Sequence, residues 1–452
     1  MGRHHRITTA LALLLAASVA GCAKAPGASP GLAQEALARQ AGARGAGDVM
    51  AYAAEDGGTI LDGTLDGRQF ALAVPKNWNR QALLFAHGYS APGSSLAVLR
   101  NPIQKTPGTE LLRLAYSQGF AVGHSAYDKA GVGVQTGVGR TLALKHFVDR
   151  MGASRVYISG ASMGGTITIA LIEQHPQEFA GALAACGPAE WSAEIGAIID
   201  MRALYNYFTA GTKYALPGQR SLKVSALSPV APRGLGFAQP LWGALQMKRM
   251  ASPVVALFED AQKDPNGQAA RIIRNVASAS GEFGPEFASF ALPLLTAGLG
   301  QDDMVSSMGG IVYDNQAKVY RSAFLSDAEN AALNKGIERM TADPGAVAYA
   351  AQWHDANGRS PVKLVTLHNA VDSLVPYARE KELAAVTAAA GNSGNLMQLT
   401  VPPKLGSMPG VKLKGLAHCG FTADQVTLAW NDLRQWVETG RKPGASPSGA
   451  AH

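Results

Sequence analysis

The sequence VYISGASMGGTITIALIEQ, residues 156–174, decides the fold. Four strand-forming residues (VYIS) precede GASMGG, which matches the pattern G-x-S-x-G, and a helical pattern follows. This pattern is typical of a chain that leaves a strand, turns sharply and enters a helix, with Ser162 exposed on the strained turn. The same pattern occurs at Gly27–Gly31, where no strand precedes it. We therefore predict that Ser162 is the nucleophile.

Short apolar runs alternate with helical patterns on both sides of this stretch, through residues 49–190 and 350–440. The runs predicted as strands include Ala82–Ala86, Phe120–Gly123, Val156–Ser159, Ala182–Ala185 and Val362–Leu367. Strands separated by helices of this length predict a mostly parallel central sheet with helices on both faces. The rhythm breaks over residues 191–349, which are rich in Met, Tyr, Phe and Pro. We predict that this segment is a large, mainly helical cap inserted into the core.

The beginning of the chain has the pattern of an export signal. Residues 1–21 combine a basic start with the apolar run Ile7–Val19, which is too short to span a bilayer of about 30 Å with any margin. The run ends in VAGC, which resembles the bacterial lipobox, whose cysteine (here Cys22) is acylated. The alternative is an ordinary signal peptide with an incidental cysteine. The lipobox predicts an exported protein, lipid-anchored in the bacterial outer membrane or another membrane facing the periplasm.

Two further segments look unstructured in the sequence. Residues 22–48 are rich in Ala, Gly and Pro and are predicted to be a flexible linker between anchor and domain. Residues 441–452 are predicted to be a disordered tail.

Composition narrows the classes of function. The chain has 452 residues, 47% of them hydrophobic, which indicates a folded core rather than disorder. The net charge of +7 includes two arginines of the leader, and the chain has no basic stripe with interleaved aromatic residues. A nucleic-acid partner is therefore not expected. The sequence lacks a phosphate-binding loop, an H-E-x-x-H motif and a Cys/His cluster with metal spacing, so we expect neither cofactor nor metal.

A second motif ends the strand at residues 82–86. His87-Gly88-Tyr89 allows the backbone to bend at the glycine, so that the Tyr89 amide faces an incoming carbonyl oxygen. Together with the Met163 amide, it is predicted to form an oxyanion hole. We expect His87 itself to brace the loop rather than to carry a proton.

The remaining partners of Ser162 are expected in the order acid, then histidine. The histidines after the cap segment are His354, His368, His418 and His452. His452 lies in the tail and a base must follow the acid, so His418, in the loop GLAHCG, is the predicted base. The strand KLVTL leads into HNAVDSLVP, which places Asp372 a few residues past a strand end. We predict Asp372 as the acid that orients the imidazole, with Asp355 and Glu190 as alternatives.

With these motifs in place, the chain resembles serine hydrolases of the α/β-hydrolase superfamily. The likeness covers residues 57–190 and 350–440 and rests on the His-Gly strand end, GASMGG, LHNAVDSLVP and AHCGFT. It implies the α/β-hydrolase fold and hydrolysis of a carboxylic ester, small or oligomeric, through an acyl-enzyme. An amidase or peptidase using the same residues is the second possibility. A lipoprotein that keeps the fold only for binding is the third. The sequence does not indicate the oligomeric state.

Within the superfamily, the loop HCGFT resembles exported bacterial esterases and amidases, and also the tannase and feruloyl-esterase group. In that group a cysteine follows the catalytic histidine and its partner directly precedes the serine, where this chain has Ala161. Here the remaining cysteines are Cys186, after the strand next to the serine turn, and Cys419, after His418. We expect both in one loop layer, joined by a disulfide that an oxidising compartment permits. Two buried free thiols are the alternative.

Overall fold

The structure is a computed structural model that describes residues 31–407 and 413–444. The predicted signal peptide (residues 1–21), Cys22 and most of the predicted tail (residues 441–452) lie outside the described residues. Among the described residues, no helix is both long and apolar enough to cross a membrane.

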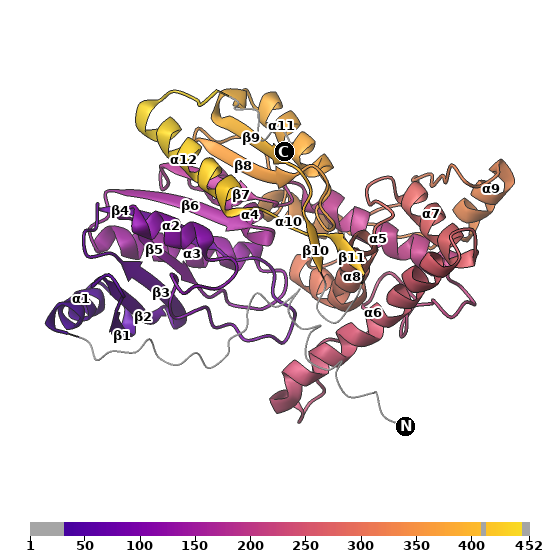
Figure 1. Cartoon of the computed structure of the whole chain (residues 1–452), viewed down its shortest axis with the longest axis horizontal. Helices are drawn as coiled ribbons and strands as arrows, with labels where there is room; N and C mark the ends of the chain where they lie inside the picture. Colours follow the sequence, from indigo (N-terminus) through magenta and orange to yellow (C-terminus); the bar gives the residue numbers. More distant parts are fainter. Residues whose placement is uncertain (1–30, 408–412, 445–452) are drawn as a thin grey trace.

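A nine-stranded sheet forms the centre of the core (Figure 1). In spatial order its strands are β1 (Gly47–Ala53), β2 (Thr59–Leu65), β3 (Arg68–Val74), β5 (Ala121–Ser125), β4 (Gln81–Ala86), β6 (Arg155–Ala161), β7 (Gly181–Ala185), β8 (Leu364–Asn369) and β9 (Leu396–Val401). The pairs β1–β2, β2–β3 and β3–β5 are antiparallel, and the strands from β5 to β9 are parallel. Because β4 and β5 exchange places, the end of β4 lies beside the end of β6.

Helices cover both faces of this sheet (Figure 1). One face packs against α3 (Val134–Arg150), α4 (Met163–Gln174) and α11 (Ala378–Ala389), and the other against α2 (Glu110–Ser117) and α12 (Ala423–Thr439). The two apolar cores are separate: Phe147 and Ile167 belong to the first, Leu112 and Trp430 to the second. A mostly parallel sheet enclosed in this way confirms the predicted α/β-hydrolase fold.

The segment between β7 and β8 forms a helical cap beside the core (Figure 1). Its elements are α5 (Trp191–Phe208), the 3₁₀ turn η2 (Gly236–Ala238), α6 (Gln239–Lys263), α7 (Gln268–Ser280), α8 (Phe287–Met308), α9 (Asp327–Gly336) and α10 (Pro344–Trp353). These helices occupy the predicted insertion, residues 191–349, and α10 continues a few residues beyond it.

The predicted flexible linker, residues 22–48, is wrong over its described second half. Residues Leu32–Ala43 form helix α1, and β1 follows it and pairs with β2. Ala41 is fully buried, and the Arg44 carbonyl accepts a hydrogen bond from Arg150 Nε at 3.0 Å. The helix has few large apolar residues, so its periodicity is weak in the sequence. It is stabilised by packing on the edge strand, which the local sequence does not report.

An ion cluster around a buried arginine joins the cap to the core. Arg379, in α11, is 1% exposed and forms ion pairs with Glu282 and with Glu382, the latter at 2.9 Å. Glu194, in α5, lies 3.7 Å from Arg379 Nε. Glu194 and Glu282 belong to the cap. Arg379 is the second residue of α11, the helix that follows the loop with the predicted acid. A single guanidinium therefore links cap and acid loop.

The carboxyls of this cluster outnumber its cation. Burial raises the pKa of Glu194 well above its usual value, and the neighbouring Arg379 opposes this only in part. Burial likewise raises the pKa of Glu382 to about 7 against the effect of Arg379. When folding raises the pKa of a carboxyl, its contribution to stability is fully present below the pKa of the unfolded state, about 4.3. This contribution is lost as the pH rises through the pKa of the folded state. The cluster is thus most stable in mild acid and weakest above pH 7.

We expect Arg379→Met to lower the free energy of unfolding by about 3 kcal/mol at pH 8, because it leaves the buried Glu194 and the half-buried Glu382 without their cation. At pH 5 the loss is smaller, since these carboxyls take up protons. Chemical denaturation at both pH values measures the difference. Lys263→Met is the control, because it removes an exposed ion pair with Asp260, and no measurable change is expected. An equal loss at both pH values contradicts the role given to the cluster.

Candidate active site

The serine turn lies between β6 and α4. Ser162 has φ 56° and ψ −129°, a region that few non-glycine residues adopt, and its N–H donates to the Ala185 carbonyl at 3.0 Å. A Cβ atom on Gly160 would lie 2.1 Å from the Gly164 carbonyl oxygen. A Cβ on Gly164 would lie 2.0 Å from the Ala86 carbonyl oxygen. Both positions therefore require glycine, which explains the motif in physical terms.

The structure brings the three predicted residues Ser162, His418 and Asp372 together. Ser162 Oγ lies 2.9 Å from His418 Nε2, and His418 Nδ1 lies 2.8 Å from Asp372 Oδ1. The three side chains follow different elements: Ser162 follows β6, Asp372 follows β8, and His418 follows β11 (Lys414–Leu416), which pairs with β10 (Leu405–Ser407). This is the chain of hydrogen bonds through which a histidine can take a proton from a serine hydroxyl.

Asp372 is held as an ionised acceptor. Its side chain is fully buried, Oδ1 also accepts from the Leu374 and Val375 N–H groups, and Oδ2 accepts from the Cys419 N–H. Burial opposes ionisation, but the His418 charge and these hydrogen bonds outweigh it and lower the pKa of Asp372. Because an ionised carboxylate only accepts, His418 carries its proton on Nδ1. Nε2 is then free to accept the hydroxyl proton of Ser162.

The two alternative acids lie elsewhere. Asp355 accepts hydrogen bonds from the Trp191 N–H and from the N–H and hydroxyl of Ser192, and so holds the first turn of α5. Glu190 is the residue before that helix. Within the described residues, Asp372 is the only carboxylate hydrogen-bonded to the imidazole of His418.

The predicted oxyanion amides lie next to Ser162. A Cβ on Gly88 would be 3.2 Å from the Ala161 carbonyl oxygen and 3.6 Å from Ser162 Cβ, so the end of β4 lies directly against the serine turn. Within the described residues, the N–H groups of Tyr89 and Met163 donate no hydrogen bond. Both are therefore available to an oxygen atom that develops negative charge beside Ser162.

His87 braces this loop. Its ring stacks on Tyr127 with the centroids 3.7 Å apart, and Tyr127 donates its hydroxyl proton to the His87 carbonyl at 3.0 Å. His87 Nδ1 lies 3.0 Å from the Gly88 carbonyl oxygen. Burial lowers the pKa of His87 to about 4, so its ring is neutral at physiological pH. These contacts agree with a bracing role for His87.

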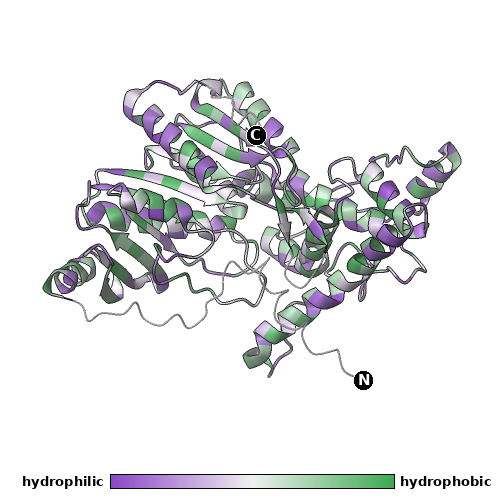
Figure 2. Ribbon diagram, viewed as in Figure 1, coloured by the Kyte–Doolittle hydropathy of each residue, from purple (hydrophilic) through white to green (hydrophobic). Residues whose placement is uncertain are grey.

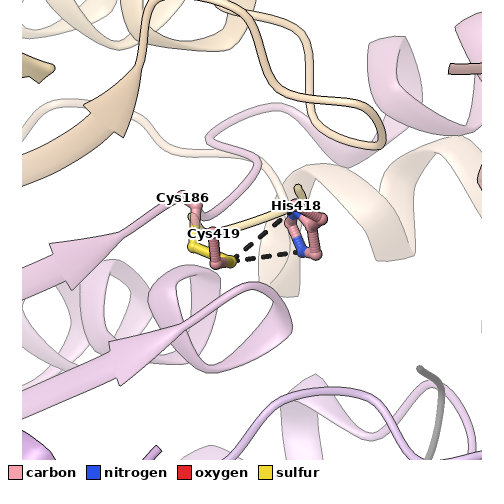
Figure 3. Close-up of side chains that lie close together, drawn as sticks. All are labelled: Cys186, His418 and Cys419. Carbon is pink, nitrogen blue, oxygen red and sulfur yellow. Dashed lines mark hydrogen bonds between the residues drawn. A yellow bond between two sulfur atoms is a disulfide. The ribbon is translucent and has the colours of Figure 1, made fainter. Parts of the chain in front are cut away.

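The disulfide expected between Cys186 and Cys419 is present, with the two Cα atoms 5.4 Å apart (Figure 3). It joins the residue after β7 to the residue after His418. Cys419 Sγ lies 3.3 Å from His418 Nε2, so the bond runs alongside the imidazole. Cys186, His418 and Cys419 have the spacing of metal ligands. However, thiolates are the metal-binding form of cysteine, and these sulfurs are bonded to each other, so the group is not a metal site.

Asn369, the last residue of β8, has a role that the sequence analysis did not assign. It is fully buried, its Oδ1 accepts from the Gly420 N–H at 2.9 Å, and its Nδ2 donates to the Gly420 carbonyl at 3.0 Å. Nδ2 also donates to the Pro402 carbonyl at 3.0 Å. The amide therefore fixes the backbone two residues after His418. Its one mark in the sequence is that it is a polar residue at the end of an apolar strand, three residues before the predicted acid, and this mark alone does not reveal its partners.

The cap contacts the oxyanion side of the site through Asp303, in α8. Its carboxylate pairs with Lys129 Nζ at 3.0 Å and accepts from the Val132 N–H at 2.6 Å. The same loop contacts the residue after Ser162, because the Gly133 N–H lies 3.4 Å from Met163 Sδ. Burial, with a contribution from Asp303, raises the pKa of the Tyr89 phenol. The cap thus supports the loops on the oxyanion side of Ser162.

Comparisons with known proteins find one matching family model and several similar solved structures. The model of the prolyl oligopeptidase family matches residues 135–214. Similar solved structures include feruloyl esterase B from Aspergillus oryzae (14% identity, TM-score 0.45, 90% of this chain and 91% of that one). The rice cell wall degrading esterase LipA from Xanthomonas oryzae (13%, 0.38, 88% and 92%) and proline iminopeptidase from Mycobacterium smegmatis (12%, 0.38, 84% and 100%) are also similar. A comparison with curated proteins finds no match.

We expect Asn369→Asp to lower kcat by roughly tenfold to a hundredfold with little change in KM, because it replaces two donated hydrogen bonds by a carboxylate facing two carbonyls. Turnover of a 4-nitrophenyl ester measures this. Asn392→Asp is the matched control, since Asn392 Nδ2 donates to the Gly358 carbonyl far from Ser162 in the sequence. Equal kinetics for the two variants would show that Asn369 does not position His418.

Proposed function

We propose that this α/β-hydrolase-fold chain is a serine hydrolase that cleaves a carboxylic ester through an acyl-enzyme. The observation that carries the proposal is the unbroken chain from Ser162 Oγ through His418 to the buried carboxylate of Asp372. The amides of Tyr89 and Met163 beside Ser162, which donate no hydrogen bond to any residue that the structure describes, support it. The hydrogen-bonded chain supplies a nucleophile, and the two amides can stabilise the oxyanion that its attack creates.

In the first half of the reaction, Ser162 Oγ attacks the substrate carbonyl while His418 Nε2 takes the hydroxyl proton. Asp372 keeps the imidazole in the required tautomer and stabilises its positive charge. The carbonyl oxygen becomes an oxyanion, and the amides of Tyr89 and Met163 donate to it. His418 then gives its proton to the leaving alkoxide, the ester bond breaks, and the acyl group remains on Ser162.

In the second half, a water molecule takes the place of the alcohol. His418 Nε2 accepts a proton from the water, whose oxygen attacks the acyl carbonyl. The tetrahedral intermediate uses the same two amides. His418 returns the proton to Ser162 Oγ, and the carboxylic acid leaves.

An ester is the favoured substrate, because its alkoxide needs no activation to leave beyond the proton that His418 gives it. Amide or peptide hydrolysis is the second candidate. The specific observation in its favour is the match of residues 135–214, which include the serine turn, to the prolyl oligopeptidase family model. The two candidates differ in the leaving group alone, so matched substrates can separate them.

Ser162→Ala is expected to abolish labelling by a fluorophosphonate probe and to lower the hydrolysis of 4-nitrophenyl esters by at least about a thousandfold. Ser117→Ala, which alters an exposed hydroxyl in α2, is expected to behave like the wild type. Anilides with the same acyl group give the second readout, and their turnover should be far slower. Anilide turnover equal to ester turnover selects the peptidase, and a wild type that is neither labelled nor active selects a binding protein.

We also propose that the chain is exported and lipid-anchored through Cys22. The lipobox VAGC supports this, and so does the disulfide, because stable disulfides form in oxidising compartments. The residue after the cysteine is Ala23 and not an aspartate, which favours sorting to the outer membrane.

Mass spectrometry of the protein expressed in a Gram-negative bacterium tests the anchor. The mature wild-type chain is expected to begin at Cys22 and to carry acyl groups, whereas Cys22→Ser is expected to carry none and to leave the detergent-soluble membrane fraction. Ala23→Ser controls for the substitution itself and should remain acylated. A wild-type chain that is cut after another residue and has no acyl group contradicts the anchor.

A further inference from the structure

A group of exposed apolar side chains lies at the beginning of helix α6. Its members, called the α6 face from here on, are Val230, Leu235, Phe237, Leu241 and Leu245. Phe237 is 85% exposed and Leu241 is 77% exposed. Large apolar side chains that gather on a surface mark an interaction site, whereas isolated ones need no explanation.

The α6 face is an ordered surface. Leu241 and Leu245 are four residues apart and so lie on one side of α6, and Phe237 lies in the 3₁₀ turn η2 that leads directly into this helix. The loop before it is fixed to the helix by Gln239, which accepts from the Ala231 N–H at 2.8 Å and donates to the Pro229 carbonyl at 2.9 Å. The same end of α6 projects beyond the other cap helices along the lower edge of the view in Figure 1, and Figure 2 shows apolar positions along it.

The stretch of sequence that carries the α6 face is basic. Residues 201–258 contain seven Lys and Arg and no Asp or Glu. Six of these cations are exposed: Lys213, Arg220, Lys223, Arg233, Lys248 and Arg249. Lys248 and Arg249 lie three and four residues beyond Leu245, so they lie on the same side of the helix, one turn past the apolar stripe. Within the described residues, neither Arg233 nor Lys248 has an acidic partner. An apolar stripe bordered by cations is the pattern of a helix that lies on an anionic membrane.

We propose that the α6 face docks on the surface of an anionic lipid bilayer. Lipid headgroups match the cations, and the acyl region accepts the apolar side chains, so one partner satisfies both halves of the pattern. A second copy of the chain would place cations against cations across a symmetric interface. The leader adds Arg3 and Arg6 and no acid, so it does not complement the charge either. Nucleic acid would leave the apolar stripe without a partner.

The position of the proposed anchor supports this partner. Cys22 lies nine residues before Gly31, the first described residue, and nine residues span at most about 30 Å. Helix α1, which follows, lies at the left end of the core in Figure 1, and the projecting end of α6 lies lower and nearer the middle of the view. An anchored chain therefore keeps the folded domain within reach of the bilayer. Two attachments, an acyl group and a basic apolar surface, give firmer binding than either alone.

The end of α6 that carries this face contacts the loop that follows Tyr89. Gly93 lies four residues after Tyr89, and a Cβ on it would be 2.8 Å from the side chain of Gln239, the first residue of α6. The loop that carries one oxyanion amide is thus in contact with the proposed membrane-binding end of the cap. Docking would hold this side of the site at the lipid surface. The proposal concerns binding and does not depend on the proposed hydrolase activity.

Vesicle sedimentation tests the α6 face with a chain that begins at Ala23. This chain contains every described residue and lacks both the apolar leader and the acylated cysteine. The wild type is expected to sediment with vesicles of phosphatidylcholine and phosphatidylglycerol, and much less with phosphatidylcholine alone. Raising the salt from about 0.1 to about 0.5 M should weaken the binding. Phe237→Ser/Leu241→Ser should lower the partition coefficient roughly tenfold or more, and Arg233→Gln/Lys248→Gln should remove the preference for anionic vesicles.

Val319→Ser/Phe324→Ser is the matched control, because it removes two exposed apolar side chains of the cap outside the α6 face. It should bind vesicles like the wild type. The proposal is overturned if the wild type does not bind anionic vesicles, or if the two apolar double variants bind equally. Sedimentation velocity without lipid gives a further test. A dimer that Phe237→Ser/Leu241→Ser converts to a monomer would identify a second copy as the occupant and would also overturn the proposal.

Discussion

The close approach of three backbone segments behind Ser162 sets the geometry of the whole site. The Gly164 carbonyl lies where a Cβ of Gly160 would be, and the Ala86 carbonyl lies where a Cβ of Gly164 would be. Because β4 and β6 are paired in parallel at this point, the same contact fixes the position of the loop that carries Tyr89. The positive φ of Ser162 is stable only while these segments remain packed. Ser162 and the two amides proposed to form the oxyanion hole are therefore one structural unit, fixed by the absence of two side chains.

Asp372 and His418 form a second unit, which is assembled around the Asp372 carboxylate. Its two carboxylate oxygens bind the imidazole, the Cys419 N–H and two N–H groups of its own loop. Asn369 holds the backbone beyond His418, and the disulfide holds the residue between them. These contacts cross long distances in the sequence and leave the imidazole little freedom. The cap adds support from outside, through Arg379 on the acid side and Asp303 on the oxyanion side.

Local patterns predicted the parts of the molecule that local physics determines. The strand, turn and helix around Ser162 and the strand ends before His87 and Asp372 carry their own glycine and apolar signals. His418 followed from chain order alone. The roles of Asn369 and Arg379 could not be read in this way, because each depends on partners that only the fold brings close. Helix α1 was missed for a related reason: its Ala-rich sequence is a weak pattern, and its packing against the sheet decides the outcome.

The disulfide has a topological consequence. Cys186 lies where the chain leaves the core for the cap, and Cys419 lies where it completes the site, so the bond closes a ring with a sequence separation of 233 residues that contains the entire cap. An extracytoplasmic protease that cuts a cap loop once would open this ring without releasing a fragment. The piece with Ser162 and the piece with His418 would stay covalently joined at the residue beside the imidazole. A nicked molecule would thus remain a two-chain protein with its serine and histidine still tethered.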